Sequence, residues 1–139
     1  MAVFLRLGAV GKPLIHTAVP PSRKQPDALR IGILGAAKIA PPAVIWPASK
    51  REDVVIAAVA ARDVARASKY AKAHGIPKVH SSYLDLVMDP AIDAIYNPLP
   101  NGLHARWTIE ALKRGKHVLC EKVLAMPPHL LHCLQPLAS

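Results

Sequence analysis

The sequence predicts an α/β protein built on a doubly wound parallel sheet, and three observations lead to this fold class. Apolar segments of strand length alternate with helical segments along residues 29–122. The links between them are short, and glycine or proline marks most of their ends. One segment, Val54 to Ala61, is apolar without interruption, as expected of a central strand covered by helices on both faces. Strands and helices that alternate in this way form parallel sheets through right-handed crossovers.

Residues Leu29 to Leu34 are expected to form the first strand, which a glycine-containing turn follows. Pro41 and Pro42 suit the first turn of the next helix, where the amide hydrogen that proline lacks would have no partner within the helix. Pro47 is expected to end or kink that helix early, because an interior proline removes a hydrogen bond and clashes with the preceding turn.

After the central strand, a helix is expected from Asp63, a suitable N-cap, through His74, with Gly75 as its C-terminal stop. Ser82 is expected to cap a short helix that ends at Asp89. The other predicted elements are a strand at 78–80, a strand at 94–96, a loop at 97–102, a helix at 104–114 and a strand at 117–120.

The helix predicted over 104–114 is strongly amphipathic. Ala105, Ile109 and Leu112 share one face, and charged residues occupy another. Such a division into two faces is typical of a surface helix.

The turn after the first strand carries small residues in the pattern of a dinucleotide-binding fingerprint. Aligned with G-x-G-x-x-G/A, the segment GILGAAKIA places Gly35, Ala37 and Ala40 at the three small positions. Small residues there let the backbone approach a pyrophosphate, and the helix N-terminus supplies amide groups and a partial positive charge. Ordinary strand-to-helix turns also carry small residues, but this turn opens the first β–α–β unit. The predicted cofactor-binding residues of the turn are Gly35, Ala36, Ala37, Lys38, Ile39 and Ala40.

The end of the second strand indicates which dinucleotide is bound. An acidic residue at this place hydrogen-bonds the ribose 2′-hydroxyl of NAD, whereas an arginine accommodates the 2′-phosphate of NADP. Arg62 follows the central strand directly, and a guanidinium pairs well with a phosphate. Asp63 is the alternative, as a ligand of the hydroxyl. We predict NADP in preference to NAD.

The formal net charge of +9 raises nucleic-acid binding as an alternative function. However, the 18 Lys and Arg residues are dispersed, and no basic run interleaves with the aromatic residues that a stacking platform needs. A domain that holds a phosphate-rich cofactor accounts for the sign of the charge equally well. No apolar run approaches the ~18 residues of a membrane span. We therefore expect neither nucleic-acid nor membrane binding.

Composition divides the chain into three zones. Residues 1–28 carry four cations and no acid before Asp27, which suits a mitochondrial targeting segment or a flexible arm. Pro13 interrupts any helix there and favours the arm. Residues 29–122 form the predicted folded domain. Residues 123–139 contain three prolines but no Lys, Arg, Asp or Glu, so we expect a divergent tail.

His129, His132 and Cys133 in that tail are the candidate metal ligands. A structural zinc needs four well-spaced ligands, and the sequence has no partner cluster elsewhere, so no metal site is expected. With only two cysteines no disulfide framework is implied, and a reducing compartment, the cytoplasm, is expected.

Three segments together carry a resemblance to a known family: GILGAAKIA (32–40), NPLPNGLH (97–104) and KHVLCEK (116–122). Residues 29–122 resemble the N-terminal half of the glucose–fructose oxidoreductase/inositol dehydrogenase (Gfo/Idh/MocA) family. Within it, they are most similar to the NADP-dependent D-xylose and trans-dihydrodiol dehydrogenases. The resemblance implies a Rossmann domain that binds a nicotinamide dinucleotide.

The resemblance also implies roles for residues that follow the later strands. The loop that holds Asn97, Pro98, Asn101 and His104 would line the cofactor site. Glu121 and Lys122 would occupy the family's Glu-Lys-Pro motif, whose lysine lies near the nicotinamide and the reacting carbon. Both segments follow predicted strands, at the carboxyl edge where open α/β sheets bind ligands. Lys122 is therefore the predicted catalytic residue, with a solvated surface cation as the alternative.

The chain departs from the family after that motif. Val123 replaces the family's proline, and relatives continue with a second domain that supplies the substrate pocket and usually a catalytic histidine. We therefore expect a truncated chain that binds cofactor without full activity, whereas a complete relative would transfer hydride from a sugar or diol hydroxyl to NADP. An inert remnant or a cofactor-binding module without enzymatic role is the alternative. Apolar surface left uncovered would favour a homodimer.

Overall fold

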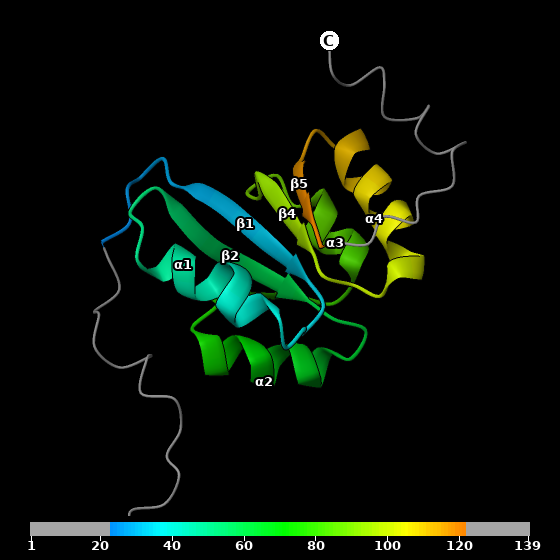
Figure 1. The fold of residues 1–139 in the computed structure, drawn as a ribbon, viewed down its shortest axis with the longest axis horizontal. Helices are drawn as coiled ribbons and strands as arrows, with labels where there is room; N and C mark the ends of the chain where they lie inside the picture. The colour runs from blue at the N-terminus through cyan, green and yellow to red at the C-terminus, as the bar shows by residue number, and fades with distance from the viewer. Residues whose placement is uncertain (1–22, 122–139) are drawn as a thin grey trace, which may run out of the picture.

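The computed structural model describes residues 23–121, which form one five-stranded parallel sheet with helices on both faces (Figure 1). The strands are β1 (Leu29–Leu34), β2 (Val54–Ala60), β3 (Lys78–His80), β4 (Ala94–Asn97) and β5 (His117–Cys120). The helices are η2 (Pro41–Ile45), α1 (Trp46–Ser49), α2 (Val64–His74), α3 (Tyr83–Met88) and α4 (Asn101–Lys113). The strand order β3-β2-β1-β4-β5 is that of a doubly wound sheet, in which the winding reverses between β1 and β4. The predicted fold class is confirmed.

Each face of the sheet has its own apolar core. On one face, residues of η2, α1 and α2 pack on Ile33, Val59 and Tyr96. On the other face, residues of α3 and α4 pack on neighbouring strand positions such as Leu34 and Ile95. The middle strands are thus covered on both sides, which explains why their sequences are apolar without alternation.

Local sequence signals set the ends of α2 and α3 as predicted. Asp63 Oδ1 accepts the amide hydrogens of Ala65 and Arg66, at 2.9 and 3.3 Å, and so caps α2. Ser82 caps α3 in the same way. Gly75 follows α2 with a φ of 66°, a left-handed conformation that suits glycine.

The helix after β1 begins at the predicted place but differs in kind. Its first turn, η2, is π-helical, and α1 continues it for four residues. Pro47 lies inside this helical stretch, which ends soon afterwards at Ser49, as the proline predicts.

The prediction for α4 was wrong in its start, and the apolar face named from the sequence is not the most buried face. The helix begins at Asn101 instead of His104, because the chain already turns after Pro100, whose carbonyl accepts the amide hydrogen of Leu103 at 2.8 Å. Ala105, Ile109 and Leu112 are only half-buried. The residues that meet the core are Leu103, Trp107 and Ala111.

Bonds from β4 explain this rotation of the helix. The side-chain amide of Asn97 donates to the carbonyl oxygen of His104 and to Thr108 Oγ1, both at 3.2 Å. These bonds turn the side of α4 that carries His104 and Thr108 toward the sheet.

Two further observations concern residues 23–121 alone. No helix in this range is long and apolar enough to cross a membrane. No three His, Cys, Asp or Glu side chains of the range are placed together to hold a metal ion. The predictions for residues 1–22 and 122–139, Lys122 and the histidines of the tail included, lie outside the described residues.

Candidate functional site

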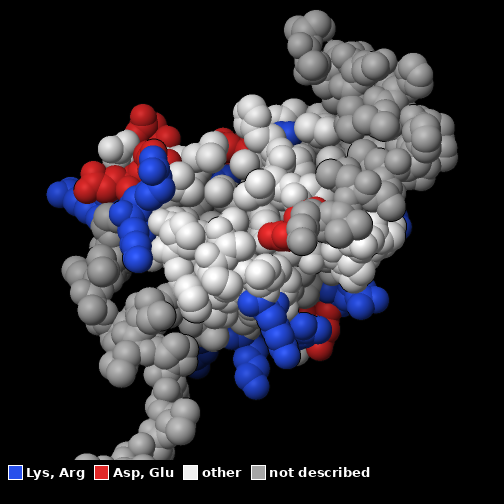
Figure 2. Space-filling view, in the orientation of Figure 1, with Lys and Arg blue, Asp and Glu red and all other residues white. Residues whose placement is uncertain are grey.

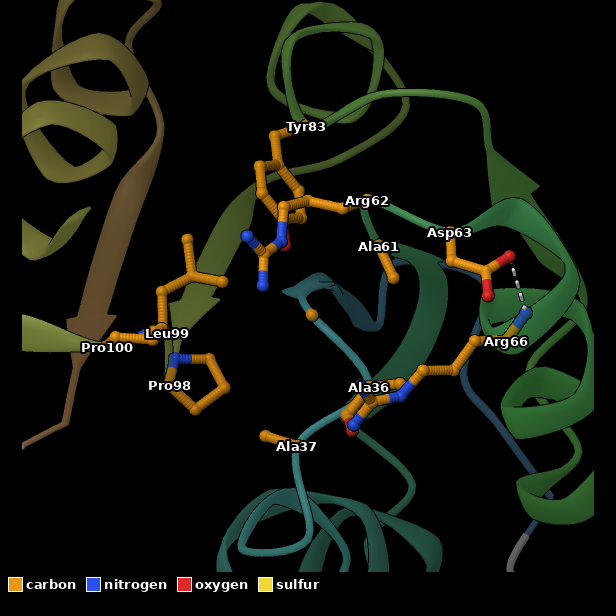
Figure 3. A pocket seen from close by; sticks show the side chains of 11 residues that line it. Ala36, Ala37, Ala61, Arg62, Asp63, Arg66, Tyr83, Pro98, Leu99 and Pro100 are labelled. Atoms are coloured by element: carbon orange, nitrogen blue, oxygen red, sulfur yellow. Dashed lines mark hydrogen bonds between the residues drawn. The ribbon is translucent and has the colours of Figure 1, made fainter.

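A cavity of about 530 Å³ opens at the carboxyl ends of β1, β2 and β4, where the winding of the sheet reverses (Figure 3). This is the position at which open α/β sheets bind ligands, and the volume lies within the roughly 300–1,000 Å³ of small-molecule sites. Its lining residues come from the ends of these strands and from α2 and α3: Gly35, Ala36, Ala37, Ala61, Arg62, Asp63, Arg66, Tyr83, Pro98, Leu99 and Pro100.

The turn after β1 requires glycine and alanine at particular positions. Gly35 has a φ of 87°, and a Cβ there would lie 3.1 Å from Leu99 Cδ2. Its backbone amide donates a hydrogen bond to the carbonyl oxygen of Ala60 at 2.6 Å, and this bond ties the turn to the end of β2. Ala40 is fully buried in the core under η2, where a larger side chain would push the helix away from the sheet.

Amide groups of this turn are available to a ligand. Among residues 23–121, the amides of residues 36–39 have no hydrogen-bond acceptor. The helix contributes less than expected, because Pro41 and Pro42 at its start have no amide hydrogen and Ala43 donates to the carbonyl oxygen of Ile39 at 3.1 Å. An anion at this turn would therefore be held by loop amides rather than by the helix N-terminus.

Two arginines give the cavity wall a positive charge. In Figure 3 the guanidinium of Arg62 points into the cavity, and the side chain of Arg66 reaches across to the turn after β1. Arg66 Nη2 donates to the carbonyl oxygen of Ala36 at 3.1 Å. The one carboxylate of the wall, Asp63, already accepts two amide hydrogens of α2 through Oδ1. Two cations and one anion favour a negatively charged ligand.

Basic residues continue along α2 beyond the cavity. The helix carries Arg66, Lys69 and Lys72 and no acidic residue of its own. Figure 2 shows Lys and Arg side chains gathered along the edge of the molecule where α2 lies, below a largely uncharged centre. The field around the cavity entrance is therefore positive, which raises the local concentration of anions.

The loop after β4 is shaped by Asn97. This asparagine is fully buried, and its side chain accepts the amide hydrogen of Leu99 at 3.3 Å besides the two bonds that it donates to α4. The described bonds of its side chain all stay within the segment 97–108. Asn97 therefore holds Pro98 and Leu99 at the cavity wall and does not face the cavity itself.

Glu121 lies beside the end of β4. Its carboxylate accepts a hydrogen bond from Tyr96 Oη at 2.5 Å, and its amide donates to the carbonyl oxygen of Asn97 at 3.1 Å. Burial, and secondly the bond to Glu121, hold the pKa of the Tyr96 phenol well above its usual value, so the phenol stays a donor.

His104 is buried in the first turn of α4. Neither ring nitrogen has a hydrogen-bond partner among the described residues. Buried imidazoles usually have partners, so this residue stands out.

The structure brings only some of the predicted site residues to one cavity. Gly35, Ala36, Ala37, Arg62 and Pro98 line it. The predicted residues that do not line it are Lys38, Ile39, Ala40, Asn97, Asn101, His104 and Glu121.

Six residues of the cavity wall were not predicted as site residues: Ala61, Asp63, Arg66, Tyr83, Leu99 and Pro100. Asp63 was considered only as the alternative to Arg62. Arg66 had a usable signal, because the helix predicted from Asp63 places it in the first turn, next to the end of the second strand. Tyr83 had no such signal, because the crossover between β3 and β4 brings it to the cavity. Its ring packs edge-on against that of Trp107, with ring centroids 5.2 Å apart.

Comparison with known proteins gives a consistent result. Residues 29–138 match the sequence model of an oxidoreductase family with an NAD-binding Rossmann fold, GFO_IDH_MocA. Over 96 residues the chain is 51% identical to D-xylose 1-dehydrogenase (NADP(+)) 2 of Haloferax volcanii, which covers 69% of this chain and 29% of the relative. It is 46% identical over 74 residues to trans-1,2-dihydrobenzene-1,2-diol dehydrogenase of Xenopus laevis, covering 53% and 22%.

Among solved structures, the 3-ketoreductase KijD10 of Actinomadura kijaniata in complex with NADP and TDP-benzene superposes with a TM-score of 0.72 at 32% identity. The alignment covers 80% of this chain and 34% of KijD10. The chain thus spans about 30% of the length of the curated relatives that it matches.

Proposed function

The chain belongs to the Gfo/Idh/MocA oxidoreductase family, with its NAD-binding Rossmann fold, and from this premise we propose that residues 29–122 bind NADP. One observation carries the proposal: a single cavity joins the unpaired amides of the turn after β1 to two arginines at the end of β2. NADP carries a pyrophosphate and a 2′-phosphate, so it matches both groups of donors.

The pyrophosphate would lie against the turn from Gly35 to Ile39. The amides of residues 36–39 have no acceptor within residues 23–121, and Gly35, Ala36 and Ala37 leave the approach unobstructed. These features fit a pyrophosphate without any contribution from the proline-led start of η2.

The adenosine 2′-phosphate would be held by Arg62, with Arg66 beside it. Both guanidiniums line the cavity, and Asp63 caps α2 through Oδ1, so two cations outnumber the one acid that could hold the ribose hydroxyl of NAD. KijD10 binds NADP and the Haloferax volcanii relative is an NADP-dependent enzyme, which supports the same choice.

For the whole protein we propose the reaction class of these relatives, oxidation of a sugar or diol hydroxyl. Bound NADP would supply the hydride acceptor. Lys122 would hydrogen-bond the substrate oxygen, and Glu121, fixed by Tyr96, would orient the segment that carries it. Pro98 would form part of the wall beside the nicotinamide, and Asn97 would hold the loop that carries it.

The 139 residues by themselves are proposed to bind NADP without turning over a sugar, because the relatives' activities belong to chains of which this one covers about 30%. A cytoplasmic location and a homodimer are further proposals. Fractionation of cells and sedimentation of the purified chain test them.

Thermal unfolding with and without each dinucleotide tests the cofactor. A ligand of the native state stabilises it by about 2.7 kcal/mol at a hundredfold excess over Kd. We expect a larger rise in the unfolding temperature with NADP than with NAD. No rise with either dinucleotide would contradict the proposal and favour an inert domain.

A further inference from the structure

Two side chains of α2 hold the turn after β1 from one side. Arg66 Nη2 donates to the carbonyl oxygen of Ala36 at 3.1 Å, and Tyr70 Oη donates to that of Ala37 at 3.0 Å. The donors are four residues apart, so they lie one above the other on the same helix face. Their acceptors are consecutive carbonyls of the segment proposed to bind the pyrophosphate.

These bonds fix the direction of the neighbouring amides. In a trans peptide the C=O and the following N–H point in opposite directions. With its carbonyl held by Arg66, Ala36 leaves the amide of Ala37 pointing away from that arginine. The carbonyl of Ala37 accepts from Tyr70 and also, at 3.2 Å, from the amide of Ala40. With its carbonyl held in this way, Ala37 leaves the amide of Lys38 pointing away from α2. Neither amide has an acceptor within residues 23–121.

The two donors differ in how firmly they are held. Arg66 is exposed and lines the cavity, so an incoming phosphate competes with Ala36 for its guanidinium. Tyr70 does not line the cavity, and its ring is packed between two apolar clusters and against His74, with centroids 4.5 Å apart. Burial also raises the pKa of Tyr70 to about 12, so the hydroxyl keeps its hydrogen at neutral pH.

We propose that Tyr70 is a positioning residue for the pyrophosphate: its hydroxyl holds the carbonyl of Ala37 so that the next amide faces the ligand whether or not Arg66 has turned to a phosphate. This inference rests on the proposed function of the cavity. Tyr70 would thus affect the affinity for the ligand without touching the ligand.

Tyr70→Phe tests the proposal, because it removes the hydroxyl and keeps the ring in place. The matched control is Asp93→Ala, which removes one side-chain bond to a backbone amide, that of Arg30 at 2.8 Å, at the opposite edge of the sheet. The purified 139-residue chain and both variants are titrated with NADP, NAD and adenosine 2′-monophosphate, which has no pyrophosphate. Amide hydrogen exchange of the segment 35–40 is measured without ligand.

We expect Tyr70→Phe to raise the Kd of NADP and of NAD by the same factor, about three- to tenfold, as loss of one half-buried hydrogen bond allows. The Kd of adenosine 2′-monophosphate should stay unchanged, and exchange of the Ala40 amide, whose acceptor is the Ala37 carbonyl, should accelerate. Asp93→Ala should change none of these values.

Unchanged dinucleotide affinity and unchanged exchange in Tyr70→Phe would overturn the inference and leave Tyr70 as a core residue only. An equal loss for adenosine 2′-monophosphate would also overturn it, since the effect would then not pass through the pyrophosphate. If the unaltered chain binds neither NADP nor NAD, the proposed function itself fails.

Discussion

Arg62 carries the predicted choice of cofactor at the scale of single residues. Arg62→Ala should weaken NADP binding by about 1.5 kcal/mol, roughly tenfold, because an exposed charged hydrogen bond is partly screened. NAD affinity should change less than about twofold. Isothermal titration measures both. Arg51→Ala removes an equal charge at the far edge of the sheet, where Arg51 pairs with Asp53 at 2.5 Å, and should leave both affinities unchanged. An equal loss of NADP and NAD affinity would contradict a role at the 2′-phosphate.

Gly35 gives a second prediction at this scale. Gly35→Ala places a Cβ on a backbone with a φ of 87° and 3.1 Å from Leu99 Cδ2, so it should destabilise the fold by about 1–2 kcal/mol. Gly102→Ala is the control, because a Cβ there meets nothing within 4 Å and alanine suits a helix. Urea unfolding measures both variants. Equal stability of the two would show that the turn relaxes without strain.

The sequence predicted the residues whose roles are local. Gly35 and Arg62 follow strands directly, and their positions in the chain are enough to place them at the edge of the sheet. Tyr70 was missed because its hydrogen bond joins it to Ala37, 33 residues away in the chain. Tyr83 was missed because a later crossover brings it to the cavity and to Trp107. No local pattern contains that information.

At the scale of elements, Asp89 joins β3 to the end of α3. Its buried carboxylate accepts hydrogen bonds from Lys78 Nζ at 2.7 Å and from the amide of Ala91 at 2.9 Å, and lies 3.0 Å from His80 Nε2. The bond from Lys78, chiefly, lowers the pKa of Asp89 from 3.8 to about 2. Because the pKa is lowered in the native state, the ionised Asp89 carboxylate adds to the free energy of unfolding above pH 3.8, and this contribution is lost as the pH falls toward 2.

Asp89→Asn should therefore reduce the loss of unfolding free energy across that pH range by about 1 kcal/mol. The effect is this small because Lys78 is exposed and solvent screens its charge. Urea unfolding at several pH values checks this, with Lys78→Met as a variant that should reduce that loss in part. The same steep fall in Asp89→Asn as in the unaltered chain would assign the acid sensitivity to other carboxylates.

Element ends were predictable where a side chain caps a helix, as Asp63 and Ser82 do. The start and buried face of α4 were not, because Asn97 in the neighbouring strand sets them through long-range bonds. Apolar periodicity alone selects a face only where no polar contact from the sheet competes with it.

At the scale of the whole molecule, the alternation of strands and helices was enough to predict the sheet and the edge at which its ligand cavity lies. The strand order β3-β2-β1-β4-β5 follows from right-handed crossovers, and it brings the ends of β1 and β4 together. The shape of the cavity was not predictable, since it depends on residues from four separate crossovers.

The whole-molecule prediction concerns turnover. The 139-residue chain should bind NADP and show no NADP-dependent oxidation of D-xylose or a dihydrodiol, followed by absorbance of the reduced nicotinamide. The Haloferax volcanii relative, assayed beside it, is the positive control. Detectable turnover by this chain would show that the residues needed for chemistry lie within it.

Pro41 and Pro42 have a consequence for the speed of binding. Each proline fixes its own φ, so the backbone at the end of the turn has little conformational freedom before a ligand binds. The entry of the turn is tied to β2 through Gly35, and its middle is tied to α2. A dinucleotide thus meets a segment ordered at three points and loses little chain entropy there on binding. Association should accordingly follow a single exponential in a stopped-flow experiment, with no slow loop-ordering phase after the encounter.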